Sequence, residues 1–235
     1  MDLADKLKHV PSVASIIADT IAELIYSAEL KPGQFLRQEA LSQQFGVSRV
    51  PVRDALHVLQ QQGLVVSVPR RGVMVRPVTR KAVRDFYELR RAVEPFIARK
   101  VCACASPQDI EALGDLIDQH MEAAKQNNWS QALKIDEQFH FGIAGLADNE
   151  ELYTLIVGVW ARLRQIRSIV RADAEWAHLW AHHSIERHRQ ILAALKGGDP
   201  EAAAQVVDQV ICESEKELTM RFEALKWFQD QDGQE

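Results

Sequence analysis

A chain of 235 residues, 47% of them hydrophobic and 26% charged, has the composition of a soluble globular protein and is long enough for two domains with separate cores. No stretch stays apolar for the roughly 18 residues that a membrane helix needs, and residues 1–5 lack the basic start of a signal peptide, so we expect no membrane partner. The three cysteines, an odd number, argue against a disulfide framework and favour a reducing, cytoplasmic location.

The net charge of −5 is unevenly distributed along the chain. Residues 1–78 hold 9 Lys and Arg against 7 Asp and Glu, whereas residues 79–235 hold 19 against 26. Five arginines and a single aspartate fall between residues 48 and 76. The basic charge is therefore local, as expected for a surface that docks on DNA, and the acidic remainder would stay away from the phosphates.

Two amphipathic helices are predicted before this basic segment. The first covers residues 11–28, where apolar side chains recur at helical spacing, and a Pro32-Gly33 turn ends it. The second covers about 38–45, before Gly46. The residues expected to point inward from this second helix are Ala40, Leu41 and Phe45.

The stretch Gly46–Leu56 has the pattern of a turn followed by a recognition helix. Ser48 suits the N-cap, because its hydroxyl can accept a hydrogen bond from a free first-turn amide. The inward face is predicted to consist of Val52, Ala55, Leu56 and Leu59. Arg49 and Arg53 are four residues apart and project away from that face, where they suit guanine edges or phosphates in a major groove. A surface helix with two solvated arginines is the alternative.

Two short β-branched runs follow this helix, which is expected to end at Gly63. The turn that joins residues 64–68 to residues 73–75 contains Pro69, Arg70, Arg71 and Gly72. The pattern predicts a hairpin with a basic tip, although an ordinary surface turn would look similar. A helix-turn-helix followed by such a hairpin is a winged helix, whose wing would reach phosphates or the minor groove.

Residues 79–235 contain no convincing strand and predict an antiparallel helical bundle. The predicted helices run roughly over 79–104, 107–127, 130–146, 150–171, 177–196 and 200–228. Breaks are expected at Ser106-Pro107, Asn127-Asn128, Asp148-Asn149, Asp173 and Gly197–Pro200. We therefore predict a mainly α protein with a winged-helix DNA-binding domain over residues 1–78 and an all-α effector-binding and dimerisation domain over residues 79–235.

Asp136 and His140 are the first candidates for metal ligands. They are four residues apart, so both project from one face of one helix, which is a common way to present two ligands. His188 lies on a later predicted helix that can face them across the bundle. A charged pair inside a bundle is the alternative.

Residues about 10–76 resemble the N-terminal domain of the GntR family of bacterial transcription regulators. The resemblance is carried by Leu30–Gly33, Leu41-Ser42, Phe45–Leu56, Leu59, Gly63–Val65 and Arg71–Val73. It implies a homodimer on operator DNA, with Arg49 and Arg53 reading bases or phosphates and Val50 beside a thymine methyl. The match also implies a wing with Arg70, Arg71 and Gly72 at its tip. Arg37, near the start of the second helix, is a further candidate for a phosphate contact.

The second half resembles the FCD ligand-binding domain of the FadR branch of the same family. The resemblance is carried by Leu89–Pro95, Asp136–His140, His188–Leu195 and Gly198-Asp199. It implies that Asp136, His140 and His188 bind a divalent metal such as Zn²⁺, Ni²⁺ or Mn²⁺, with a fourth ligand, usually histidine, about 22 residues later. That count arrives at Val210, and its neighbours Asp208 and Cys212 lie on other helix faces. Water or a ligand carboxylate would then complete the shell.

A pocket between bundle helices suits a small organic acid as effector. Arg90 matches a family position near the pocket and can pair with a carboxylate, although a salt bridge to Glu94 is an equally good interpretation. We expect a repressor released by a small carboxylate, and not an enzyme. One alternative is a constitutive DNA binder with an inert dimerisation bundle. A remote one is a metal-dependent hydrolase, which lacks an obvious general base and leaves the winged helix unexplained.

Overall fold

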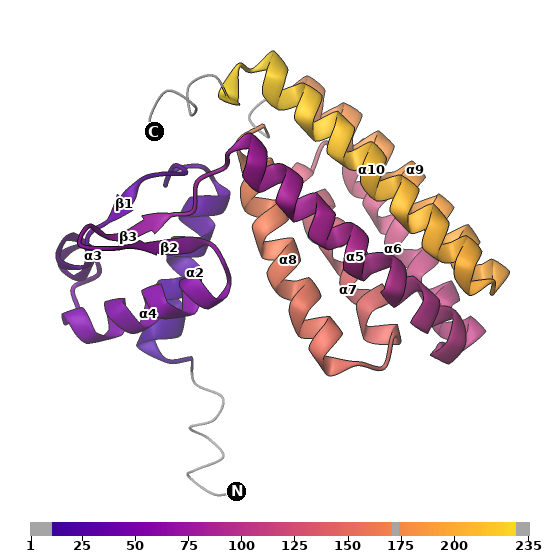
Figure 1. Cartoon of the computed structure of the whole chain (residues 1–235), viewed down its shortest axis with the longest axis horizontal. Coiled ribbons are helices and arrows are strands. Elements are labelled where there is room, and N and C mark those ends of the chain that lie inside the picture. The colour runs from indigo at the N-terminus through magenta and orange to yellow at the C-terminus, as the bar shows by residue number, and fades with distance from the viewer. Residues whose placement is uncertain (1–10, 171–173, 229–235) are drawn as a thin grey trace, which may run out of the picture. The chain divides into compact units, whose positions relative to one another are not determined.

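The computed structural model of the protein describes residues 11–170 and 174–228 (Figure 1). The predicted break at Asp173 lies outside the described residues. The chain divides into two compact units. The first unit contains the described residues up to Val78 together with Ala161–Ile169, and the second contains Thr79–Trp160 and the residues from Val170 onward. Ala161–Ile169 thus belongs to the first unit, although its sequence pattern predicts a place in the second domain.

The first unit is a winged helix-turn-helix, as predicted. Its elements are α2 (Val13–Tyr26), β1 (Phe35–Leu36), α3 (Gln38–Phe45), α4 (Arg49–Gln61), β2 (Val65–Val68) and β3 (Gly72–Val75). The strands form an antiparallel sheet in the order β1-β3-β2. Strand β1 was not predicted, because two residues are too few to show the alternation that marks a strand.

The core of this unit lies where α4 packs against α2 and β2. The four residues predicted to face inward from α4 are all buried. In α3 the prediction was wrong for Ala40, which is exposed, while Ser42 is buried beside Leu41. Ser42 tolerates burial because its hydroxyl donates a hydrogen bond to the carbonyl oxygen of Glu39 at 2.8 Å.

The last part of α8 (Glu150–Ser168) belongs to the first unit. The Arg164 guanidinium lies 4.1 Å from the centre of the Tyr26 ring. Arg162 donates a hydrogen bond to the carbonyl oxygen of Pro77 at 2.7 Å, and Gln165 donates one to that of Arg76 at 3.1 Å. Burial, with repulsion from Arg76, lowers the pKa of the Arg162 guanidinium. These contacts fix residues 76 and 77 against α8.

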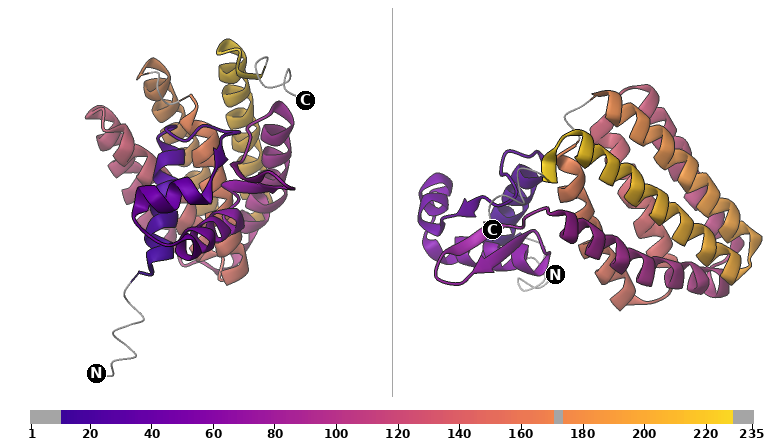
Figure 2. Two further views of the ribbon diagram at one scale, coloured as in Figure 1. Left: turned by 90° about the vertical axis from the view of Figure 1, so that its left-hand side faces the viewer. Right: turned by 45° about the horizontal axis from the view of Figure 1, so that its top comes forward.

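The second unit is a bundle of long helices. They are α5 (Arg80–Cys104), α6 (Pro107–Lys125), α7 (Trp129–Leu146), the first part of α8, α9 (Ala174–Gly197) and α10 (Pro200–Ala224). Helix α10 packs along α5 and α9, and α6 packs along α7 and α9 (Figure 2). No helix within the described ranges is long and apolar enough to cross a membrane.

Local signals set where these helices begin. Ser106 and Asp109 form a capping box at the start of α6, and Pro107 occupies its first turn. Asp199 caps α10 by a simpler arrangement, in which its side chain accepts hydrogen bonds from two first-turn amides. The short α6–α7 and α9–α10 connections keep these neighbours antiparallel, so α6, α7 and α9 present their inner faces to one another.

Candidate functional site

Arg49, Val50 and Arg53 lie on the exposed side of the first turns of α4. Val50 is 55% exposed, so its side chain is accessible at the start of α4. Ser48 occupies the N-cap position, but its hydroxyl makes no capping hydrogen bond, so that expectation was wrong. The hydroxyl lies at the exposed start of the helix, beside Arg49.

Both arginines of α4 are paired with carboxylates at the surface. Arg49 donates to Glu39 at 2.6 Å, and Arg53 donates to Asp54 through Nε at 3.2 Å and Nη2 at 3.1 Å. Each arginine side chain is 65% exposed, so these pairs contribute little to stability. The guanidinium groups can therefore exchange a carboxylate for a phosphate or a base edge at small cost.

The tip of the β2–β3 hairpin is the predicted wing. Arg70 and Gly72 both have positive φ, +61° and +104°, which produces the tight turn there. Arg71 lies with its guanidinium 4.7 Å from the centre of the Phe35 ring. Arg37 and Arg71 line the same surface recess, so β1 brings these two predicted contacts together.

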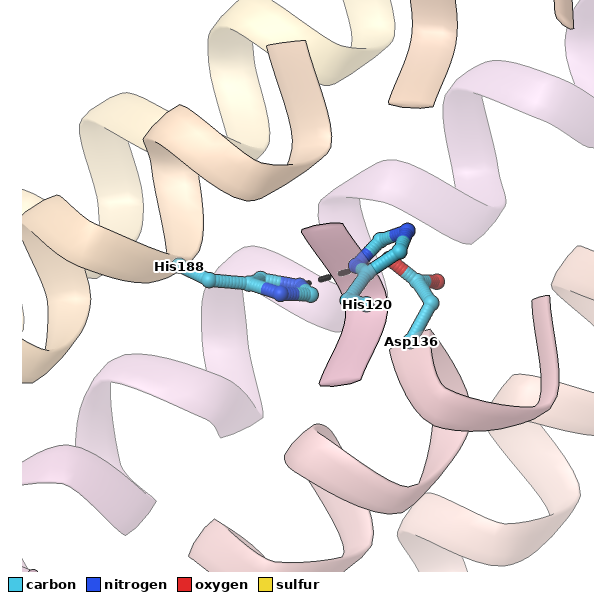
Figure 3. A group of neighbouring side chains, drawn as sticks. All are labelled: His120, Asp136 and His188. Atoms are coloured by element: carbon cyan, nitrogen blue, oxygen red, sulfur yellow. Dashed lines mark ion pairs between the residues drawn. The ribbon is translucent and has the colours of Figure 1, made fainter. Parts of the chain in front are cut away.

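Three ligand-bearing side chains converge in the bundle, each from a different helix (Figure 3). His120 comes from α6, Asp136 from α7 and His188 from α9, and all three are buried. Each offers an atom that lies within 4.8 Å of the others. The carboxylate Oδ1 of Asp136 lies 3.3 Å from His188 Nε2, and the Ser184 hydroxyl donates a hydrogen bond to the same Oδ1.

His140, the third predicted ligand, lies beside this cluster and not inside it. Its Nε2 is 3.2 Å from His188 Nε2, and its ring stacks on Trp160 at 4.1 Å. The structure therefore groups Asp136 and His188 with His120, which was not predicted, and leaves His140 at the edge of the group in contact with His188. The available signal for His120 was its place on the buried stripe of α6 after Leu113 and Ile117, but a lone histidine on such a stripe is usually an ordinary core residue.

Two of the distances between these atoms fit a divalent transition metal. Ligand atoms of a tetrahedral site with bonds near 2.0–2.1 Å lie roughly 3.3 Å apart. The distances at His188 Nε2, 3.2 Å to His140 and 3.3 Å to Asp136, match that edge. Imidazoles combined with a carboxylate are also a donor set that Zn²⁺, Ni²⁺ and Mn²⁺ accept.

Helix α10 contributes no atom to this cluster. Val210 is buried on the same side of α10 as Val207, which lines a neighbouring pocket. Asp208 instead accepts two hydrogen bonds from Arg91, at 2.8 and 3.1 Å, at the surface. Cys212 is half-buried and absent from the cluster, so neither neighbour of Val210 substitutes for a ligand there.

A narrow pocket with a cavity volume of about 20 Å³ opens beside His140. Its walls are apolar apart from one histidine and one carboxylate. The lining residues are Glu94, Ile97, His140, Ile143, Ala144, Ile156, Trp160, Ile191 and Val207. A small molecule in this pocket would contact His140 and Glu94 as its polar partners.

Arg90 lies behind this pocket wall and forms the salt bridge that the sequence analysis gave as its alternative. Its Nε and Nη2 donate to the two carboxylate oxygens of Glu94 at 2.6 and 3.3 Å, and its guanidinium lies over the rings of Tyr87 and Trp160. Burial lowers the pKa of Arg90, but the attraction and hydrogen bond of Glu94 outweigh this effect and raise the pKa overall. Its Nη1 is buried with no hydrogen-bond partner among the described residues.

Comparison with known proteins agrees with this architecture. The family described as "Bacterial regulatory proteins, gntR family" matches residues 14–75, and the FCD domain family matches residues 85–212. The Nta operon transcriptional regulator of Aminobacter aminovorans is 31% identical over 184 residues, which cover 78% of this chain and 84% of that protein. The HTH-type transcriptional repressor RspR of Escherichia coli K12 is 26% identical, over 86% and 87% of the two chains.

Solved structures show the same fold. The E. coli protein McbR/YncC superposes with a TM-score of 0.72 at 21% identity, over 91% of this chain and all of that one. The structure of a "putative transcriptional regulator GntR" from Rhodococcus sp. RHA1 superposes with a TM-score of 0.70 at 24% identity. The superposition covers 88% of this chain and 97% of that one. The families and relatives are transcriptional regulators and not enzymes.

Proposed function

Because the chain belongs to the GntR family of bacterial regulatory proteins and carries an FCD domain, we propose that it is a homodimeric repressor whose operator DNA is released when a small carboxylate binds. Regulation of transcription through DNA binding is the activity of this family. The observation that carries the proposal is the exposed arginine pair on α4, held above a fully buried helix face. A dimer would place two such helices in successive major grooves of a pseudo-palindrome.

The DNA contacts divide into two groups in this proposal. Arg49, Arg53 and Val50 read base edges in the major groove, the arginines through guanine and the valine through a thymine methyl. Phosphate and minor-groove contacts come from the residues at the edges of the surface, which are Arg37, Ser48, Arg70, Arg71 and Gly72.

The wing gives a prediction of its own. Arg71→Ala is expected to weaken binding to all DNA sequences equally and to reduce the salt slope of binding by about 2 for a dimer, because each lost phosphate contact removes about 0.9. Arg71→Lys, which keeps the positive charge, should retain the slope. Fluorescence anisotropy across a salt series measures both variants, and an unchanged slope for Arg71→Ala would contradict a phosphate contact at the wing.

We place the effector in the pocket beside His140. The metal site at Asp136, His140 and His188 would supply positive charge at one end of an acid. The bound metal would act there as a Lewis acid that attracts a carboxylate oxygen. Occupation of the pocket would favour one of two placements of the DNA-binding units, and so change operator affinity.

The test is fluorescence anisotropy on labelled DNA from upstream of the protein's own gene. We expect tight binding that weakens steeply with salt and is relieved by at least one carboxylate among acetate, succinate and citrate. Specific binding that none of a wider carboxylate set changes would favour the constitutive alternative. Weak binding on this fragment, followed by failure to enrich any sequence from a random library, would overturn the DNA-binding proposal.

A further inference from the structure

We propose that His120 of α6 is a ligand of the metal centre, where it supplies the imidazole that the family resemblance places at position 210 of α10. The inference rests on the proposed metal site and adds a residue to it. With His120 included, the compact group contains one aspartate and two histidines, and His140 lies beside it with its Nε2 3.2 Å from His188 Nε2. Val210 then needs no substitute on its own helix.

The packing of the bundle places His120 where a ligand is needed. Helix α6 packs against α7 and α9, the two helices that carry Asp136 and His188. The His120 side chain is fully buried, and its ring centre lies 5.5 Å from that of His188 and 5.8 Å from that of Trp180. One of its nitrogens lies within 4.8 Å of the ligand atoms of Asp136 and His188 (Figure 3).

His120 and His140 both lie next to His188, but each packs against a different part of the bundle. The His140 ring stacks on Trp160 and lines the pocket, whereas the His120 ring lies against Trp180. A cation bound at Asp136 and His188 would therefore have one imidazole from the pocket wall and one from α6. Each of these two imidazole rings packs against a tryptophan ring. This contact restricts rotation of the imidazole and fixes the direction of its nitrogens.

The charge of the site also fits this ligand set. Asp136 is its one carboxylate, and neutral imidazoles add no charge, so a divalent cation would leave the centre with a net charge of +1. Arg90 and Glu94 nearby neutralise each other. A second carboxylate from α10 would cancel the remaining charge, whereas a histidine from α6 preserves it for an anionic effector.

Cobalt(II) titration of the chelator-treated full-length protein tests the inference. We expect the wild type to bind one Co²⁺ per chain, with a visible spectrum from nitrogen and oxygen ligands. His120→Ala should weaken Co²⁺ binding by more than about 100-fold, which exceeds the usual effect of residues that only support a ligand, and should change the spectrum. His182→Ala removes an exposed histidine of α9 and should change neither quantity.

Two further variants separate the possible results. In one result, Asp136→Asn loses Co²⁺ binding while His120→Ala keeps full affinity and an unchanged spectrum. This result would overturn the role of His120 but keep the metal site. A wild type that binds no Co²⁺ or Zn²⁺ would overturn both, while operator binding measured on the same sample would still report on the DNA-binding proposal. If His120→Ala fails to fold, His120→Gln keeps most of the side-chain volume and replaces it in the same titration.

Discussion

Replacing Arg53 with alanine is expected to abolish specific operator binding while the protein stays folded. A bidentate arginine–guanine pair contributes roughly 1–3 kcal/mol, and a dimer loses two of them, so affinity should fall by about 100-fold or more. The fold should be unaffected, because Arg53 is exposed and its one ion pair lies at the surface. Anisotropy on operator DNA gives the affinity, and thermal unfolding by circular dichroism reports on the fold.

The matched control for this prediction is Arg189→Ala. Arg189 is an exposed arginine of α9 with an equally weak surface pair, to Glu186 at 3.7 Å. Its loss removes the same positive charge from the chain and should leave operator affinity nearly unchanged. Equal affinity of wild type and Arg53→Ala would show that the exposed side of α4 does not read DNA.

The second large effect is expected at the buried pair behind the pocket. Glu94→Gln should lower the stability of the second unit by about 3–5 kcal/mol, because it leaves the buried Arg90 guanidinium without its compensating charge. For a unit of this size, that loss corresponds to a fall in Tm of roughly 10 °C. Differential scanning calorimetry measures the change.

Two variants test the cause of this destabilisation. The double variant Arg90→Met/Glu94→Leu removes both charges and should recover much of the lost stability, since apolar pairs of similar volume often replace buried ion pairs without cost. Glu201→Gln breaks the exposed bidentate pair with Arg99 and should shift Tm far less. If Glu94→Gln has the same Tm as the wild type, the Arg90–Glu94 pair is more solvated than its burial indicates.

The winged helix was predictable because its signals are local. The spacing of Val52, Ala55 and Leu56 alone determines which face of α4 is buried, and the exposed positions of Arg49 and Arg53 follow from it. The Arg90–Glu94 pair is equally local, since residues four apart on a helix meet. Strand β1 was missed because its two residues become a strand only through pairing with β3.

The cluster proposed to bind a metal was predictable only in part, for the opposite reason. Asp136 and His140 share one helix face, so their spacing in the sequence is informative. His120 meets them through the packing of α6 against α7 and α9, and no spacing in the sequence records that contact. The family spacing of about 22 residues after His188 leads to Val210 on α10, whereas the additional imidazole of the cluster, that of His120, lies on α6.

The surface carboxylates that hold Arg49 and Arg53 have a consequence for how the protein searches the genome. Each arginine must leave Glu39 or Asp54 before it can contact DNA, and the two carboxylates then face the phosphates. Because both pairs are exposed and weak, this exchange lowers the affinity for random sequence only slightly. At the operator the bidentate base contacts outweigh the same cost. We therefore expect the two pairs to act mainly on the contrast between operator and random DNA, each contributing a small part of it.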